Sequence, residues 1–402
     1  MLGVKKTALV AIATVGVLAL GACTAPGAAE PTAEAGPIVI GMATAQTGWM
    51  GFYDGAADSA FTMKIDEVNA AGGVLGRQIE IITGDNQTDP ALSKVVAADL
   101  IAQGAQIIVG SCNYDIGSAA AVEAQNAGLL GLTLCGASPR WGVQGIGSYA
   151  YSAALATYAE GAVLSEYATE KGWSKPYLLI DTTLDYNKEV CQGFSEYWTD
   201  QLGGTIVGTS EFQNGDTAIP TQISDIQASG ADSVVVCSYN PGAATALRNI
   251  RAAGVDLPIM SGNSMSGTTW LETVPNLKNF HIDVYACLND DDPDPKMNAF
   301  VKAYTKKYDK APESVAIMPA YVMAEVVVAA IEQAGGATDG ASLSAVMDKM
   351  TNFPSLLATT YTPEVHINVS QPTRMVEYTD GVVTCADKTY AASKPVDLHL
   401  GG

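Results

Sequence analysis

Aromatic side chains suited to ligand binding cluster in short segments that follow apolar runs of this chain. They are Trp49, Phe52, Tyr53, Tyr114, Tyr186 and Tyr239. A tyrosine offers an apolar ring with a hydroxyl tip, so a group of tyrosines fits a partly apolar small molecule. The alternative is that each ring covers the core next to its own loop. The pattern favours a binding site over a reactive centre.

The sequence lacks the common motifs of nucleophilic catalysis and of phosphate or dinucleotide binding. It contains no Gly-x-Ser-x-Gly, no P-loop and no complete Gly-x-Gly-x-x-Gly. The three histidines, His281, His366 and His399, do not have the spacing of zinc ligands. The acidic run 290–292 is more typical of a solvated loop. We therefore expect no enzyme activity, no metal and no cofactor.

The charge balance is strongly acidic, with 42 Asp and Glu against 21 Lys and Arg and a net charge of −21. Such a surface repels phosphate backbones, so nucleic acid is not expected as a partner.

The first residues are typical of an export signal rather than of the fold. Lys5 and Lys6 precede an apolar run over 7–22, which is shorter than the roughly 20 residues of a spanning helix. The ending 20–23, Leu-Gly-Ala-Cys, resembles the bacterial lipobox, which implies cleavage before Cys23 and a lipid on its thiol. An ordinary secreted protein is the alternative. We predict a signal peptide at 1–22 and a lipidated flexible tether at 23–36, with the protein held on the outer face of the cytoplasmic membrane, in the cell envelope or periplasm.

From Pro37 onward, short apolar strands alternate with helical patterns, which is typical of parallel sheets covered by helices. The first series comprises strands at 38–42, 79–82, 107–109 and 129–134 and helices at 56–71 and 91–103. A second series comprises strands at 177–181, 205–207 and 233–236 and helices at 188–202 and 219–228. Further on come a strand at 282–288, helices at 296–308, 320–334 and 343–350, and strand character over 360–385 with a hairpin at Asp380-Gly381.

The restart of the pattern predicts two similar α/β lobes. One stretch occurs nearly twice, at 99–109 and 225–236, each time as a helix end, a Gly-containing turn and a buried strand. We expect lobe 1 to comprise 38–154 and 289–356, and lobe 2 to comprise 155–288 and 357–392.

Four segments resemble the branched-chain amino acid type of periplasmic binding protein, the receptor component of ABC importers. They are 40–48 (IGMATAQTG), 69–77 (NAAGGVLGR), 109–111 (VGS) and 247–254 (LRNIRAAG). The resemblance implies a type I periplasmic-binding fold, with two Rossmann-like lobes joined by three crossovers and closing over a ligand. It also implies a monomer that meets the permease and ATPase subunits of an importer. A ligand-sensing lipoprotein receptor that feeds a signalling partner is the alternative.

In α/β sheets, ligands bind beyond the carboxyl ends of the strands, which places the site in specific loops. We expect these residues to bind the ligand: Gln46, Trp49, Tyr53, Asn113, Tyr114, Cys135, Gly136, Ala137, Ser138, Tyr186, Tyr239 and Asn263.

The resemblance also bears on ligand chemistry. Relatives that bind amino acids hold the carboxylate with backbone amides and a Ser or Thr that matches Ala137, and the ammonium with an acidic residue that matches Asn263. Ser138 could replace the first after a small register shift, but Asn263 cannot balance an ammonium. An amide, a urea-like compound or an aromatic acid becomes as suitable as an amino acid.

Besides Cys23, six cysteines remain in an exported chain, which favours disulfides over free thiols, although fifteen connectivities are possible. Cys112 and Cys135 follow strands that should be neighbours, so they can pair. The same argument pairs Cys191 with Cys237 and leaves Cys287 with Cys385. Cys135 could instead face the ligand as a free thiol.

Overall fold

The computed structural model describes residue 3 and residues 36–400. Apart from Gly3 and Gly36, the predicted signal peptide and tether, Cys23 included, lie outside the described residues. The described residues from Pro37 onward form one compact unit. In the described part of the chain, no helix has both the length and the apolar character needed to cross a membrane.

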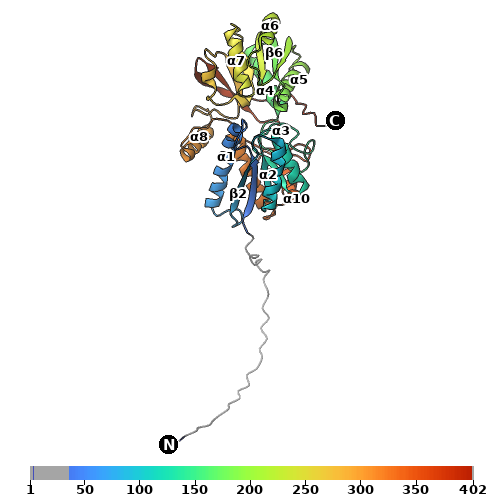
Figure 1. Cartoon of the computed structure of the whole chain (residues 1–402), viewed down its shortest axis with the longest axis vertical. Coiled ribbons are helices and arrows are strands. Elements are labelled where there is room, and N and C mark those ends of the chain that lie inside the picture. The colour runs from blue at the N-terminus through green and yellow to red at the C-terminus, as the bar shows by residue number, and fades with distance from the viewer. Residues whose placement is uncertain (1–2, 4–35, 401–402) are drawn as a thin grey trace. The chain divides into compact units, whose positions relative to one another are not determined.

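The first sheet is parallel, with the strand order β2-β1-β3-β4-β5. Helices follow most of its strands, as Figure 1 shows in its lower lobe. The elements in chain order are β1 (Ile38–Thr44), α1 (Gly51–Ala70), β2 (Ile79–Asp85), α2 (Pro90–Ala102), β3 (Ile107–Gly110), α3 (Tyr114–Asn126), β4 (Leu130–Thr133) and β5 (Ala150–Ser152).

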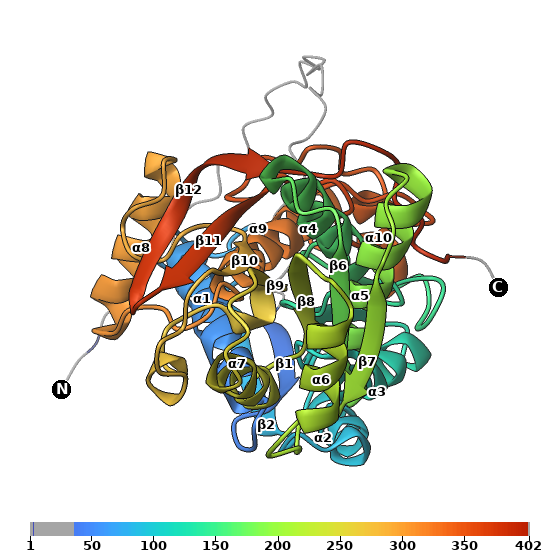
Figure 2. The same cartoon turned by 90° about the horizontal axis from the view of Figure 1, so that it is seen from above.

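The second sheet has the order β12-β11-β10-β9-β8-β6-β7. Its order from β7 to β10 repeats that of the first sheet, and the antiparallel pair β11 and β12 extends one edge, as Figure 2 shows. Its elements are α4 (Thr157–Lys171), β6 (Pro176–Asp181), α5 (Asp185–Glu196), a π-helix (Tyr197–Gln201), β7 (Gly208–Phe212), α6 (Pro220–Ala228), β8 (Ser233–Cys237), α7 (Gly242–Ala252), β9 (Ile259–Ser261), β10 (Phe280–Val284), β11 (Thr373–Thr379) and β12 (Val382–Tyr390). The predicted fold class, α/β with two Rossmann-like lobes, is confirmed.

Local sequence explains several element boundaries. In α2 and α8 (Pro295–Tyr308), a proline occupies the first turn and the preceding Asp89 or Asp294 accepts a hydrogen bond from a free backbone N–H. The hairpin between β11 and β12 turns at Asp380 and Gly381, both with positive φ, as such turns require.

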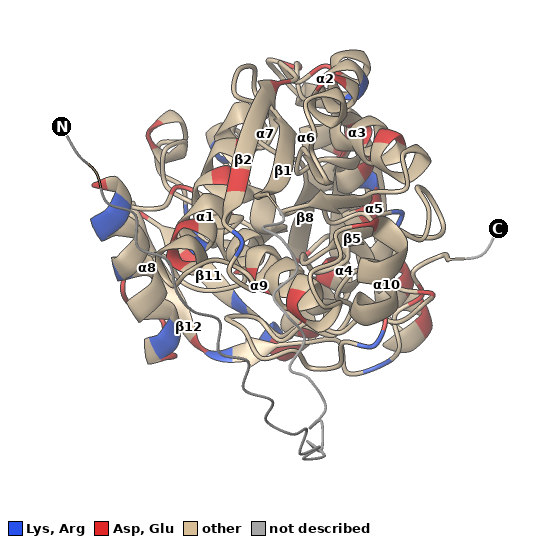
Figure 3. Cartoon of the chain, turned by 90° about the horizontal axis from the view of Figure 1, so that it is seen from below, with Lys and Arg blue, Asp and Glu red and all other residues tan. Residues whose placement is uncertain are grey.

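Between β10 and β11, the chain returns to the first sheet. Helix α9 (Ile317–Gln333) packs on α1, and α10 (Gly340–Met347) packs beside β4. Helix α8 carries several basic residues, which are blue on its ribbon in Figure 3, and its Lys307 pairs with Asp66 of α1 at 2.6 Å. The Tyr308 hydroxyl donates to the carbonyl oxygen of Ser59 at 2.6 Å.

Several element boundaries were predicted wrongly; the strand expected at 282–288, for example, is β10 and ends at Val284. The strand expected at 205–207 begins only at Gly208, where pairing with β6 starts. The helix expected at 188–202 begins earlier, at Asp185, and its last turn is the π-helix. Helices α3, α4 and α7 and the short strands β5 and β9 were not predicted individually.

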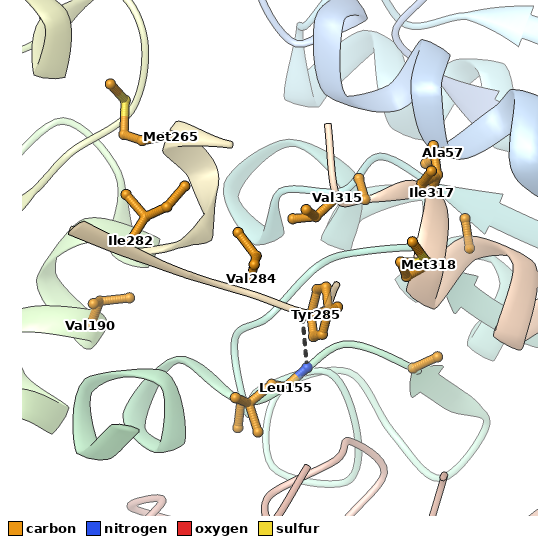
Figure 4. Close-up of a cluster of buried hydrophobic side chains, with 14 of the residues drawn as sticks. Ala57, Leu155, Val190, Met265, Ile282, Val284, Tyr285, Val315, Ile317 and Met318 are labelled. Atoms are coloured by element: carbon orange, nitrogen blue, oxygen red, sulfur yellow. Dashed lines mark hydrogen bonds between the residues drawn. The ribbon is translucent and has the colours of Figure 1, made fainter. Parts of the chain in front are cut away.

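Three segments connect the two sheets, and hydrogen bonds join them side by side. The Leu155 amide donates to the Tyr285 hydroxyl at 2.9 Å, a bond drawn in Figure 4. Asn368, in the third segment, donates from its backbone N–H to Ala154 O at 3.2 Å and accepts from Ala156 N at 2.8 Å. Its side-chain amide also donates to Ala153 O at 2.9 Å. These contacts form a three-stranded hinge.

The six cysteines of the described part form three disulfides. They are Cys112–Cys135 and Cys191–Cys237, which the strand positions predict, and Cys287–Cys385, the pair expected as the remainder. In the structure, Cys135 is therefore bonded rather than a free thiol.

Candidate functional site

A cavity of about 70 Å³ lies where the carboxyl ends of the two sheets face each other. Residues from both lobes line it: Trp49, Met50, Tyr53, Cys112, Asn113, Tyr114, Cys135, Ala137, Ser138, Leu184, Tyr186, Tyr239, Asn263, Ser264, Tyr285, Ser314 and Ala316. We call this space the cleft.

The structure brings together all but two of the predicted ligand-binding residues. The exceptions are Gln46 and Gly136. Gln46 is exposed, and its backbone N–H donates to Asp85 at 2.9 Å. Gly136 is buried behind the cleft, where a Cβ atom would stand 2.5 Å from the Trp141 indole nitrogen. Both residues support the cleft loops without lining the cavity.

Several lining residues were not predicted to be part of the site. Tyr285 directly follows β10, so the strand-end rule that selected the other loops could have found it. Ser314 and Ala316 precede α9, and no strand comes before them to signal their position. Met50 and Leu184 are apolar neighbours of predicted residues.

Two aromatic contacts span the cleft from lobe to lobe. The rings of Trp49 and Tyr239 lie 4.8 Å apart between centroids. The Tyr53 hydroxyl donates to the carbonyl oxygen of Ser264 at 3.1 Å. The structure therefore has the two lobes in direct contact around the cavity, which is a closed arrangement.

A buried carboxylate lies under the lobe 2 side of the cleft. Glu160, in the first turn of α4, accepts from the Tyr186 hydroxyl at 2.8 Å and from the Asn263 backbone N–H at 2.6 Å. Its neighbour is the carboxyl group of Asp283 of β10, and both residues are fully buried. Neither Asp283 oxygen has a hydrogen-bond partner among the described residues. Burial and the neighbouring Glu160 charge raise the pKa of Asp283 well above its usual value, so Asp283 keeps its proton in the folded protein.

An ion-pair group closes the side of the cleft. Arg140 of lobe 1 pairs with Asp185 at 2.5 Å and with Glu189 at 3.3 Å, both on α5 of lobe 2. Its guanidinium also lies 4.1 Å from the ring centre of Tyr114. Burial acts to raise the pKa of Asp185, but hydrogen bonds from Lys188 and Arg140 lower it to about 2.

The Ser138 hydroxyl belongs to this group rather than to the open cavity. It donates to Glu189 at 2.9 Å and accepts from the Arg140 side chain at 3.3 Å. Its proton is therefore engaged by a carboxylate, which counts against the expectation that Ser138 holds a ligand carboxylate.

On the lobe 1 side, Asp54 organises the loops that end in the cleft. It accepts from the backbone N–H groups of Ala45 and Cys112 at 2.7 and 2.8 Å, and from the Ser111 hydroxyl. Burial raises its pKa to about 6 despite these hydrogen bonds. Asp54 is fully buried and does not line the cavity.

The chemistry available in the cleft is that of binding. Among the described lining residues, none carries a charged side chain. A cluster of Cys287, Asp291 and Cys385 has the proximity of metal ligands, but both of its cysteines are in a disulfide. Aromatic faces, carboxamides and serine hydroxyls can instead enclose a small solute.

Comparison with known proteins agrees with this architecture. The family model described as periplasmic binding protein matches residues 37–382. The chain therefore belongs to the periplasmic binding protein family, and the predicted family is confirmed.

Two named relatives illustrate the likeness. The leucine-, isoleucine-, valine-, threonine- and alanine-binding protein of Pseudomonas aeruginosa is 25% identical over 327 residues, covering 77% of this chain and 82% of the relative. The structure of the branched-chain amino acid substrate-binding protein LivJ from Streptococcus pneumoniae, in complex with isoleucine, superposes with a TM-score of 0.75. It is 24% identical and covers 88% of this chain and 99% of that one.

A third similar structure carries a different ligand. It is an ABC transporter solute-binding protein from R. palustris in complex with benzoate, with a TM-score of 0.74. The identity is 16%, over 90% of this chain and 99% of that one. At these identities the likeness to LivJ and to the benzoate-binding protein concerns the fold.

Proposed function

We propose that this protein is the extracytoplasmic, lipid-anchored substrate-binding component of an ABC importer. The observation that supports this most is the cleft itself, a cavity enclosed by side chains from the facing ends of two sheets. A solute that contacts both lobes favours the closed form over the open form, because it gains the second set of contacts only on closure. The permease would then recognise the closed, ligand-bound form of the protein.

The ligand contacts would come from the predicted residues that line the cleft. Trp49, Tyr53 and Tyr114 approach from lobe 1, and Tyr186 and Tyr239 approach from lobe 2. Relatives are named for amino acids and for benzoate, so the fold accommodates both classes of solute. The aromatic lining of this cleft is compatible with an amino acid, an amide or urea-like compound, or an aromatic acid.

The experiment is a thermal-shift screen of small solutes followed by small-angle X-ray scattering. A true ligand raises the unfolding temperature, because binding to the folded state alone contributes about 2.7 kcal/mol at a hundred-fold excess over Kd. It should also reduce the radius of gyration as the lobes close. Tyr239→Ala should weaken this response, and Tyr149→Ala, at a tyrosine outside the cleft, should not. The proposal fails if no solute in a broad library closes the lobes.

The anchor is a separate part of the proposal, and it rests on the sequence 20–23. Mass spectrometry of the mature protein from its host membrane should find Cys23 as the first residue, with acyl chains attached. An unmodified N-terminus downstream of Cys23 would contradict the anchor and leave the binding function untouched.

A further inference from the structure

Two carboxamide side chains, one from each lobe, present buried polar atoms in the cleft without a hydrogen bond to any described residue. They are Oδ1 of Asn113 in lobe 1 and Nδ2 of Asn263 in lobe 2. An unpaired buried polar atom destabilises a protein by about 1–3 kcal/mol, so such atoms at a binding site point to a ligand that pairs with them. One of the two is an acceptor and the other is a donor.

The position of Asn113 makes its free acceptor unusual. It precedes α3 at the N-cap, where an asparagine oxygen normally accepts from a backbone N–H of the first turn. Here the side chain makes no capping hydrogen bond, although the residue is only 7% exposed. The side-chain oxygen of Asn113 is therefore not used to cap α3 and is available to accept a hydrogen bond from a ligand.

Asn263 is fixed from the other side. Its backbone N–H donates to the Glu160 carboxylate at 2.6 Å. This bond holds the residue against the floor of lobe 2, while Nδ2 remains without a partner at hydrogen-bonding distance.

The charges around the cleft disfavour a charged ligand. A ligand carboxylate would find no cationic side chain among the described lining residues, and the Ser138 proton is already engaged by Glu189. A ligand ammonium would find no carboxylate there either, because Glu160 is buried behind Tyr186 and Asn263 and already accepts a hydrogen bond from each of them. An uncharged polar ligand does not require a buried charge to be left without a partner of opposite sign.

The size of the closed cavity sets a further limit. At about 70 Å³ it is smaller than the roughly 150 Å³ cavity known to hold benzene, so the closed form favours a solute smaller than benzene.

We propose that the ligand is a small uncharged carboxamide or urea-type solute. Its carbonyl oxygen accepts from Asn263 Nδ2, its N–H group donates to Asn113 Oδ1, and its apolar part lies against the tyrosine rings. This inference rests on the proposed function, since it assumes that the cleft is the capture site. Asn113 and Asn263 then determine specificity by reading the two ends of one amide.

The test uses pairs of solutes that differ in charge but hardly in shape. Calorimetric titration compares acetamide with acetate and propionamide with propionate, and includes urea, leucine and benzoate. We expect at least one amide or urea to bind at least a hundred-fold more tightly than acetate, propionate, leucine and benzoate. Asn263→Asp, which removes the donor, and Asn113→Leu, which removes the acceptor, should each weaken that binding at least ten-fold. Asn276→Asp, at an exposed loop, is the matched control and should bind as the wild type does.

The outcomes separate this inference from the proposed function. If leucine, benzoate or another charged solute binds and closes the lobes while the amides and urea do not, the inference is wrong and the capture function stands. If an amide binds but Asn263→Asp and Asn113→Leu leave its affinity unchanged, the assigned contacts are wrong. If no solute closes the lobes, both proposals fail.

Discussion

The buried pair of Glu160 and Asp283 leads to a quantitative prediction about stability and pH. Asp283 keeps its proton in the folded protein because burial and the adjacent Glu160 charge raise its pKa well above its usual value. In the unfolded chain an aspartate ionises near pH 3.9. Folding must therefore restore a proton to Asp283 at any pH between these two values. The contribution of Asp283 to stability is fully present below about pH 3.9 and decreases as the pH rises toward the folded pKa.

The size of the effect follows from one proton. Each pH unit in that window lowers the free energy of unfolding by about 1.4 kcal/mol per proton that only the folded state retains. Asp283→Asn cannot ionise and offers an N–H donor to Glu160, so it should lose this dependence. The variant should therefore gain about 1.4 kcal/mol relative to the wild type for each pH unit within the window.

The assay is urea denaturation of the wild type and of Asp283→Asn at pH 4.5, 6.0 and 7.5. The difference in unfolding free energy between the two proteins removes the contributions of the titrating groups that do not interact with Asp283. Asp291→Asn, in an exposed loop, is the control for a change of aspartate to asparagine. If the difference between Asp283→Asn and the wild type stays constant within about 0.5 kcal/mol across the three pH values, the raised pKa of Asp283 is refuted.

Two further predictions concern the closed state and the disulfides. Arg140→Met removes the ion pair with Asp185 between the lobes. Because the arginine side chain is 38% exposed, we expect the binding free energy of the ligand to fall by only about 1 kcal/mol, or about five-fold in affinity by calorimetry. Lys188→Met breaks a pair with Asp185 inside one lobe and should leave affinity unchanged; an equal loss in both variants would contradict a role in closure. The double variant Cys112→Ser and Cys135→Ser opens a loop with a sequence separation of 23 and should lower the unfolding free energy by about 3 kcal/mol in denaturant titrations. A loss below about 1 kcal/mol would show that this bond constrains the unfolded chain little.

Much of the fold was predictable because its signals are local and repeated. Parallel strands buried on both faces form short apolar runs, as in β8, where all five residues are buried. The near-repeat of 99–109 at 225–236 corresponds to β3 and β8, which hold the same place in their two sheets. Strand boundaries were harder to predict from the sequence. Strand β7 begins at Gly208 because its pairing with β6 begins there, and the composition of the segment does not reveal that pairing.

The site was predictable only where one rule applied, that ligands meet the carboxyl ends of strands. Tyr114 and Tyr186 were found in this way, although they lie in the first turns of α3 and α5 and not in loops. Glu160 was missed because nothing in the run around it distinguishes a buried carboxylate from a solvated one. Its role depends on Asp283, which is more than 100 residues away and joins it only in the folded state.

The three-stranded hinge separates affinity from selectivity. Asn368 bonds to three residues of the first connecting segment, and none of these contacts touches the cleft lining. A substitution there shifts the balance between open and closed forms by the same amount whichever solute is bound. It therefore scales every dissociation constant by one common factor and leaves the ratios between solutes intact. Selection could tune the hinge to ambient solute concentration while the cleft residues keep their discrimination.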